Sequence, residues 1–253
     1  MDREELKYEY WFANIRKVRS RTKRKLREAM PSARHIYYIE ETTLARYVGK
    51  EEERNEILNS MKKWNLEGEY RKLEEKNIKF FPYFHTDYPS ALRTLLSAPY
   101  AVYLKGKTVP KDTLKAAIVG ARQCSPYGEH MAAKFGEALA EQNIDIISGL
   151  ARGVDGAGQR GALNAGGRSY GVLGSGADVC YPKENRGLYE DLQKRGGVLS
   201  ELPPGTPPLP QHFPARNRII SALSDIVLVI EAKDRSGSLI TADQALELGK
   251  EVY

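Results

Sequence analysis

Cysteine is scarce and long apolar runs are missing from this sequence of 253 residues. The two cysteines, Cys124 and Cys180, are too few for a disulfide framework and lack the CxxC spacing of a zinc site. The sequence contains no run of about 18 apolar residues, so it predicts no transmembrane helix. The charged N-terminal segment also lacks the apolar stretch of a secretory signal. We therefore expect a protein of the reducing cytoplasm, without a membrane contact.

Catalytic motifs are lacking as well. The four histidines, His35, His85, His130 and His212, are scattered and form no metal-ligating pair of the HxxxH type. The sequence contains no nucleophile elbow, no Walker A lysine and no GxGxxG turn followed by a ribose-binding acid. It therefore predicts no catalytic residue, no metal and no cofactor, and it favours binding over turnover.

Positive charge is concentrated in one segment. The formal net charge is +6, and Arg16–Arg34 holds nine Lys or Arg residues against one acid, so the remainder of the chain carries about −2. An anion bound elsewhere must therefore be held by a few well-placed cations. Two interpretations of Arg16–Arg34 remain open: a solvated helix face, or an additional patch that contacts phosphate.

The sequence pattern predicts three parts. Residues 1–77 are rich in helix formers and predict a small helical domain. Residues 78–114 form a bridging segment interrupted by Pro82, Pro89 and Pro99. In residues 115–253, short apolar runs alternate with helical stretches, which predicts a Rossmann-like α/β domain with a parallel sheet and helices on both faces. The expected strands are 116–119, 144–148, 170–173, 198–200 and 226–230, with another beginning at Val252; the expected helices are 130–142, 157–164, 186–194, 217–223 and 241–248.

The loops beyond the carboxyl ends of such strands are where ligands bind. In the first loop, Ser125 is a good N-cap and Pro126 suits the first helical position. The helix start then presents free N–H groups to an anion, beside Gly120 and Arg122. The alternative is a tight turn in which Arg122 pairs with a carboxylate.

The second loop contains Ser148, Gly149, Arg152 and Gly153, where glycine lets the backbone approach a ligand closely. We expect Asp155 to cap the following helix, whereas Arg152 either contacts phosphate or is solvated.

The third loop contains Lys183, Asn185 and Arg186, and it places Lys183 and Arg186 on the same rim if the preceding strand ends at Leu173. Tyr181 in this loop either stacks on a base or packs under the loop, and packing is favoured.

The fourth and fifth loops add an aromatic residue and more polar groups. Phe213 beside Arg216, Asn217 and Arg218 is the combination of stacking plate and phosphate clamps that single-strand binders use. The alternative is that Phe213 fills the core and Arg216 pairs with Glu201 or Glu231. The turn Ser236, Gly237, Ser238 opens a helix and offers N–H groups and hydroxyls to an oxyanion.

Taken together, these loops resemble the DNA-processing protein A family, also called Smf. The resemblance runs from about Ile78 to Tyr253. It rests on VGARQCSPYG from Val119, SGLARGVD from Ser148, YPKEN from Tyr181, LSELPPG from Leu199, FPARNRIISALS from Phe213 and EAKDRSGSLITADQA from Glu231. The chain departs from the family pattern at Gly158-Gln159, where an Ala-His pair is usual.

The resemblance implies a protein that binds single-stranded DNA, protects incoming strands and helps load RecA recombinase in natural transformation and recombination. It implies contacts by Arg122, Lys183 and the block from Phe213 to Arg218. It also implies a homodimer, although the family continues beyond the position of Tyr253, so we expect the domain to be incomplete there. The full set of expected DNA-binding residues is Gly120, Arg122, Ser125, Ser148, Gly149, Arg152, Gly153, Lys183, Asn185, Phe213, Arg216, Asn217, Arg218, Ser236, Gly237 and Ser238.

Two alternatives remain. One is an enzyme resembling the nucleotide phosphoribohydrolases of the lysine-decarboxylase-like group. The turn at 236–242 lacks that group's paired glycine and its glutamate, so hydrolysis would lack its base. The other is a scaffold whose loops hold only a small phosphate metabolite.

Overall fold

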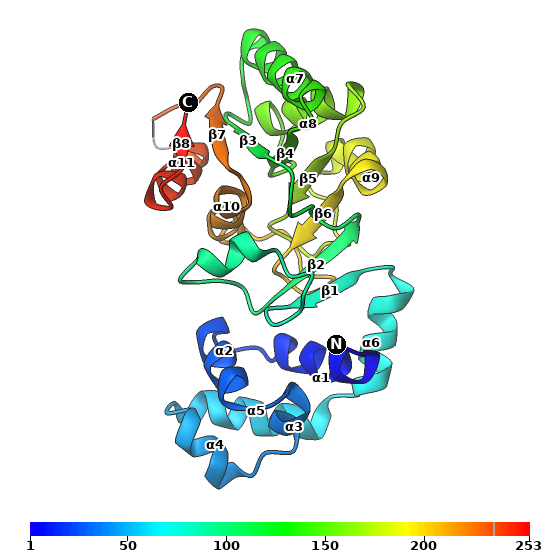
Figure 1. Cartoon of the computed structure of the whole chain (residues 1–253), viewed down its shortest axis with the longest axis vertical. Helices are drawn as coiled ribbons and strands as arrows, with labels where there is room; N and C mark the ends of the chain where they lie inside the picture. Colours follow the sequence, from blue (N-terminus) through cyan, green and yellow to red (C-terminus); the bar gives the residue numbers. More distant parts are fainter. Residues whose placement is uncertain (235) are drawn as a thin grey trace. The chain divides into compact units, whose positions relative to one another are not determined.

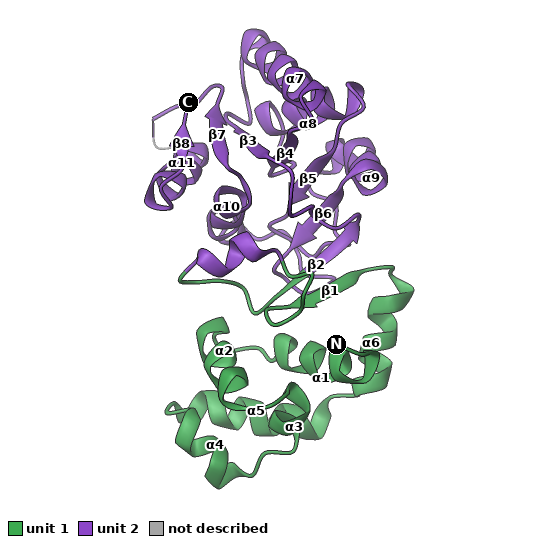
Figure 2. Cartoon of the chain, in the orientation of Figure 1, with its two compact units in different colours: residues 1–88, 96–102 green, residues 89–95, 103–253 purple. Residues whose placement is uncertain are grey.

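The computed structural model describes residues 1–234 and 236–253. Its contacts divide the chain into two compact units (Figure 2). Unit 1 consists of Met1–Tyr88 and Leu96–Val102, and unit 2 of Pro89–Leu95 and Tyr103–Tyr253. The chain therefore crosses between the units more than once in the segment from 88 to 103.

Unit 1 is helical, as the sequence predicts. Its core includes the fully buried Trp11 and Phe12 of the first helix, with Ile57 and Leu73 from later helices. The elements in chain order (Figure 1) are α1 (Arg3–Asn14), α2 (Ser20–Ala29), α3 (Ala33–Tyr37), α4 (Glu41–Tyr47), α5 (Glu51–Lys63), α6 (Leu66–Glu75) and the strand β1 (Lys79–Pro82).

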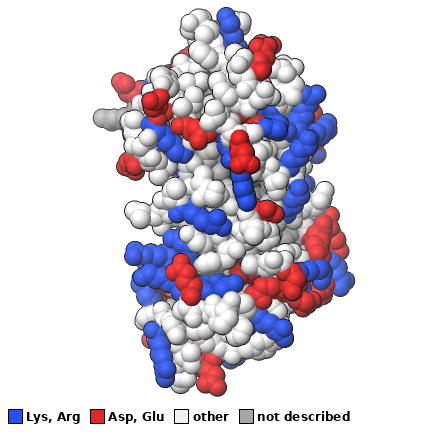
Figure 3. Space-filling model, in the orientation of Figure 1, with Lys and Arg blue, Asp and Glu red and all other residues white. Residues whose placement is uncertain are grey.

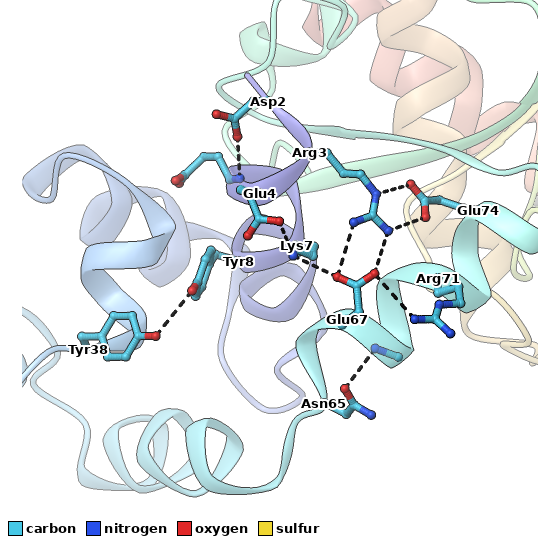
Figure 4. Close-up of polar contacts among 12 residues, drawn as sticks. Asp2, Arg3, Glu4, Lys7, Tyr8, Tyr38, Asn65, Glu67, Arg71 and Glu74 are labelled. Carbon is cyan, nitrogen blue, oxygen red and sulfur yellow. Dashed lines mark hydrogen bonds and ion pairs between the residues drawn. The ribbon is translucent and has the colours of Figure 1, made fainter.

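A surface network of charges joins α1 to α6 (Figure 4). The guanidinium of Arg3 donates to Glu74 at 2.9 Å and to Glu67 at 2.9 Å, and Lys7 donates to Glu67 at 2.9 Å. The hydrogen bonds that Glu67 accepts lower its pKa to about 2, and the bond from Arg3 has a larger effect than the bond from Lys7. Asp2 caps α1 and Asn65 caps α6 through side-chain oxygens, so both helices begin at residues that satisfy their first N–H groups.

Unit 2 is built on a twisted sheet that is mostly parallel. The antiparallel strand β2 pairs with β6 and was not predicted, because its residues 101–104 read only as a short apolar run. The other strands pair in parallel, as predicted. Across the sheet the strands are β2 (Ala101–Gly106), β6 (Gly197–Ser200), β5 (Ser169–Val172), β4 (Asp145–Ser148), β3 (Lys115–Val119), β7 (Ile226–Val229) and β8 (Glu251–Val252).

Helices cover both faces of this sheet. Ala116 and Ile118 of β3 pack in one apolar cluster with residues of α7 and α8, so these helices cover that face. Side chains alternate along a strand, so Val119 points to the other face, and α10 packs against β3, β4 and β5. The helical elements are η1 (Ser90–Thr94), α7 (Pro126–Glu141), α8 (Val154–Asn164), η2 (Lys183–Asn185), α9 (Arg186–Arg195), α10 (His212–Leu223) and α11 (Gly237–Glu247).

The strand order reverses beside β3. From β3 the chain builds outward through β4, β5 and β6, and it then returns to the opposite side of β3 with β7 and β8. In an open α/β sheet, the loops on either side of such a reversal diverge and leave a crevice beyond the carboxyl ends of the strands. The topology therefore predicts a ligand-binding crevice at the carboxyl ends of β3 and β7.

The predicted elements are all present, but four helices begin three to five residues before their expected ranges: α7 at Pro126, α8 at Val154, α10 at His212 and α11 at Gly237. For α7 the start at Pro126 is the one that the predicted cap at Ser125 requires. Pro214 did not prevent the early start of α10, because a proline in the first helical turn lacks only an N–H that has no partner within the helix. The early start places Phe213 on the first turn of α10.

Glycine permits the close packing of α7 on α8. A Cβ atom on Gly161 would lie 2.1 Å from the carbonyl oxygen of Ala133, and one on Gly136 would lie 2.1 Å from that of Gly158. We expect Gly161→Ala to lower the free energy of unfolding by about 2–3 kcal/mol, because the helices must move apart. Urea unfolding followed by circular dichroism measures this.

Gly187→Ala in α9 is the matched control. A Cβ on Gly187 would meet nothing within 4 Å. Alanine there is expected to stabilise the protein by about 0.5–1 kcal/mol through helix propensity. Equal effects of the two substitutions would contradict the packing argument.

Candidate functional site

A pocket of about 680 Å³ lies in unit 2 beyond the ends of β3, β4 and β7. This is the position at which the strand order reverses. Nine of the residues expected to bind DNA line it: Gly120, Arg122, Arg152, Phe213, Arg216, Asn217, Ser236, Gly237 and Ser238. The other seven do not line it: Ser125, Ser148, Gly149, Gly153, Lys183, Asn185 and Arg218.

The lining of the pocket is cationic. Arg122, Arg152, Arg216 and Lys233 face a single carboxylate, that of Asp155, so the formal charge of the lining is +3. Lys233 is absent from the set predicted from sequence, although it stands in the fifth loop three residues before Ser236. Its position in the loop that follows the predicted strand 226–230 was the signal available in the sequence.

Arg216 is buried beneath the pocket, with 5% of its surface exposed. Its Nη1 donates to the carbonyl oxygen of Gly149 at 2.8 Å and also to that of Val172. Burial lowers the pKa of Arg216 to about 10, and the nearby Asp155 opposes that shift. The guanidinium is therefore still cationic at neutral pH. The predicted alternative, a pair with Glu201 or Glu231, is wrong, because the guanidinium binds main-chain carbonyls next to Asp155.

Gly149 has to be glycine because of this arrangement. A Cβ at that position would lie 2.5 Å from the guanidinium nitrogens of Arg216 and 2.6 Å from a carboxylate oxygen of Asp155. The N–H of Gly149 donates to the same carboxylate at 3.0 Å. Burial acts to raise the pKa of Asp155, while Arg216 and the hydrogen bonds act to lower it, and the net shift is upward.

The predicted capping role of Asp155 is wrong. The N-cap of α8 is Gly153, whose φ of +69° is a conformation that favours glycine, and Asp155 follows inside the first turn. Its carboxylate turns back to the second loop instead. Gly153 also allows close approach to the first loop, because a Cβ there would lie 2.4 Å from the carbonyl oxygen of Ala121.

Arg122, Phe213 and Tyr181 form a stack at the pocket. The guanidinium carbon of Arg122 lies 5.3 Å from the centre of the Phe213 ring, and that ring lies 5.4 Å from the ring of Tyr181. Tyr181 is 41% exposed, so it packs on Phe213 and still presents an open face. No ion pair of Arg122 occurs among the described residues, so the alternative of a carboxylate partner is not observed.

The start of α7 is an anion site that the chain fills itself. The carboxylate of Glu231, beyond β7, accepts the N–H of Ser125 at 3.0 Å and its hydroxyl at 2.8 Å. Ser125 caps α7, as predicted, by accepting the N–H of Gly128. The expected phosphate at this helix start is therefore replaced in the structure by an internal carboxylate.

Several predicted residues shape the loops. Ser148 donates its hydroxyl to the carbonyl of Ile118, and Asn217 donates to the carbonyl of Gly237 at 2.9 Å. The amide of Asn185 donates to the carbonyls of Leu150 and Ala151, which ties the third loop to the second. The hydroxyls of Ser236 and Ser238 lie 2.8 Å apart and share a hydrogen bond.

The remaining predicted cations differ in how they are used. Arg152 is exposed, in agreement with one of its two predicted states, and it pairs with the exposed Glu184. Its contact with phosphate stays a prediction. Arg218 pairs with Glu201 at 2.5 Å. Lys183, at the start of η2, is exposed.

Gln159, which stands where the family usually has histidine, is fully buried. Its amide oxygen accepts the N–H of Leu150 at 3.1 Å, and its amide nitrogen donates to the hydroxyl of Ser169 at 3.1 Å. Gln159 thus supports the second loop from below.

Among residues 1–234 and 236–253, no group of three or more His, Cys, Asp or Glu side chains is placed to hold a metal ion. Within the same residues, no helix has both the length and the apolar character needed to cross a membrane.

Comparison with known proteins gives a consistent result. The family model described as DNA recombination-mediator protein A matches residues 79–253. Protein Smf of Escherichia coli is 43% identical over 182 residues, which are 72% of this chain and 49% of that protein. The chain thus spans about half the length of this curated relative.

Solved structures show the same likeness. The X-ray structure of DNA processing protein A from Streptococcus pneumoniae superposes with a TM-score of 0.83 at 32% identity, covering 97% of this chain and 85% of that one. A second structure, of DNA processing protein A from Helicobacter pylori, has a TM-score of 0.64 at 31% identity and covers 69% of this chain and 79% of that one.

The carboxylate at the start of α7 can be tested by Glu231→Gln. We expect the free energy of unfolding to fall by about 0.5–1 kcal/mol, because the negative charge at a helix N-terminus is lost while the side-chain volume is kept. Chemical denaturation at low salt measures the change, and added salt is expected to reduce it. Glu137→Gln, on the exposed middle of α7, is the control and is expected to change stability by no more than a few tenths of a kcal/mol. An equal loss in both variants would contradict the assignment.

Proposed function

Because the chain belongs to the DNA recombination-mediator protein A family, we propose that it binds single-stranded DNA in the pocket beyond β3, β4 and β7. The Helicobacter pylori relative is described by its single-stranded DNA binding mode. The observation that carries the proposal to this chain is the pocket itself. Four cations line it with one carboxylate, that of Asp155; one of the cations, Arg152, also pairs with Glu184, and Arg122 stacks on Phe213.

The cations of the pocket have unmet capacity for an anion. Arg122 is exposed and stacks on Phe213 without a carboxylate partner among the described residues. The Nε atom of Arg216 is buried and has no hydrogen-bond partner among those residues. Burial lowers the pKa of Arg216, and the charge of Arg122 lowers it further. A phosphate between the two guanidinium groups would relieve that repulsion.

The aromatic stack supplies the second element of single-strand recognition. Stacking of a base on an aromatic ring contributes about 1–3 kcal/mol and tolerates any base. Tyr181 and Phe213 offer such a surface beside the guanidinium of Arg122. A paired base in a duplex is already stacked between neighbours and cannot enter a concave pocket. The arrangement therefore favours unpaired strands.

The structure supports a division of the expected DNA-binding residues into two groups. We propose contacts to DNA by the pocket residues and by the exposed Lys183 on the neighbouring rim, with Arg218 held nearby by Glu201. The other group shapes the loops: Ser125, Ser148, Gly149, Gly153 and Asn185 use their polar groups or their small size within the chain.

The wider role is carried by the family resemblance. We propose that the protein protects incoming strands and helps load RecA recombinase during natural transformation and recombination, as part of a homodimer. We further propose that it acts by binding and not by catalysis. Incubation with nucleoside monophosphates tests the alternative of a phosphoribohydrolase, since release of free base would overturn this proposal.

Removal of single cations tests the site. Arg122→Ala and Lys183→Ala are each expected to reduce the slope of log K against log salt by about 0.7. Relative to the unaltered chain, each variant is then expected to bind a single-stranded oligonucleotide about fivefold more weakly at 0.1 M salt than it does at 1 M. Fluorescence anisotropy across a salt series measures both quantities. Lys134→Ala, an exposed cation on α7 outside the pocket, is the control. Unchanged slopes in both site variants would remove these residues from the interface.

Replacement of the central ring tests the stack. Phe213→Leu keeps an apolar side chain against Gly174 but removes the aromatic surface, so single-strand binding is expected to weaken about tenfold with an unchanged salt slope. Phe213→Tyr is expected to retain binding. Competition between single-stranded and duplex oligonucleotides measures the preference, and equal affinity of the unaltered chain for both would contradict the stacking role.

A further inference from the structure

The basic segment Arg16–Arg34 of unit 1 contains two kinds of cation. Lys23 is buried and donates to two main-chain carbonyls near the end of α1. Arg27 pairs with the buried Glu9 at 2.6 Å, and Arg24 donates to main-chain carbonyls. These cations stabilise the fold of unit 1 and are not available to a ligand.

Other cations of α2 are exposed. Arg21 and Lys25 point to solvent, and Lys50 does so from the turn between α4 and α5. No ion pair of these three side chains occurs among the described residues. Figure 3 shows Lys and Arg side chains gathered on unit 1 at the position of α2.

These exposed cations surround a concave site. A pocket of about 360 Å³ is lined by Arg19, Arg21, Thr22, Lys25, Tyr47, Val48, Gly49, Lys50 and Glu53. Four cations face one carboxylate, so the formal charge of this lining is +3. The acids Glu51 and Glu52 stand at the start of α5 but do not line the pocket.

The single carboxylate of this pocket is already paired with one of the four cations that line it. Glu53 is 5% exposed and accepts the Nε–H of Arg19 at 3.0 Å. Burial acts to raise the pKa of Glu53, but hydrogen bonds from Thr22 and Arg19 outweigh it and lower the pKa. The ionised Glu53 thus holds Arg19 and Thr22 in place at the pocket. Arg21, Lys25 and Lys50, in contrast, form no ion pair with any of the described residues.

The chemistry of this site fits a phosphodiester strand. Three unbalanced cations around a pocket suit successive phosphates. The ring of Tyr47, 48% exposed at the same pocket, suits an unstacked base. We propose that this pocket of unit 1 is a second contact for single-stranded nucleic acid, separate from the pocket of unit 2. This second proposal depends on the proposed function only in the class of ligand, which is single-stranded nucleic acid.

A charge-matched pair of variants of the full chain tests the second contact. Arg21→Ala/Lys25→Ala removes two cations from the pocket, and Lys62→Ala/Lys63→Ala removes two exposed cations from the end of α5 outside it. Alanine is the best helix former, so α2 is expected to stay folded, which circular dichroism checks. The probe is a labelled oligothymidylate of about 20 nucleotides, titrated across a salt series.

The first pair is expected to reduce the salt slope by about 1.4 and to weaken binding roughly 25-fold at 0.1 M salt, with equal affinity near 1 M. The second pair is expected to match the unaltered chain. Tyr47→Ala is expected to weaken binding without changing the slope, because it removes stacking and no charge. Identical behaviour of the two pairs would overturn the second contact, and so would an effect confined to duplex DNA.

The same titrations separate the two proposals. If the α2 pair weakens binding while Arg122→Ala and Lys183→Ala do not, the pocket of unit 2 is wrong and the pocket of unit 1 stands. The reverse result overturns the pocket of unit 1 alone. Absence of binding by the unaltered chain overturns both.

Discussion

The guanidinium of Arg216, buried under the loops of unit 2, binds the carbonyl groups of Gly149 and Val172 and so joins the ends of β4 and β5 to α10. Beside it, Asp155 holds the N–H of Gly149, and only glycine leaves room for both charged groups there. A charge buried in this way is stable only when its partners are fully in place. The positions of the second loop and of α10, and with them the shape of the pocket, depend on this cluster.

Around that cluster, internal pairing decides which charges remain for a ligand. Glu231 occupies the start of α7, Glu184 pairs with Arg152, and Glu201 pairs with Arg218. Arg122 is held differently, on the face of an aromatic ring. A protein of modest net charge can thus present a strongly cationic pocket, because most other charges are balanced nearby.

The same principle separates structural from available cations in unit 1. Within one short basic segment, Lys23 and Arg27 are buried or paired, whereas Arg21 and Lys25 face solvent beside a pocket. Charge density along a sequence does not distinguish these roles. A count of nine cations in Arg16–Arg34 therefore overstates the surface available to phosphate.

The sequence alone determined the succession of strands and helices along the chain from β3 to β8, the cap of α7 at Ser125 and the loops in which the pocket lies. These features follow from local periodicity and from capping chemistry. It did not reveal β2, the partner of Ser125 or the burial of Arg216. Each of these depends on contacts between residues far apart in the chain: Glu231 meets Ser125 across 106 positions, and Arg216 meets Gly149 across 67. Only the tertiary structure brings such groups together, and it thereby decided which charged side chains are left to bind a ligand.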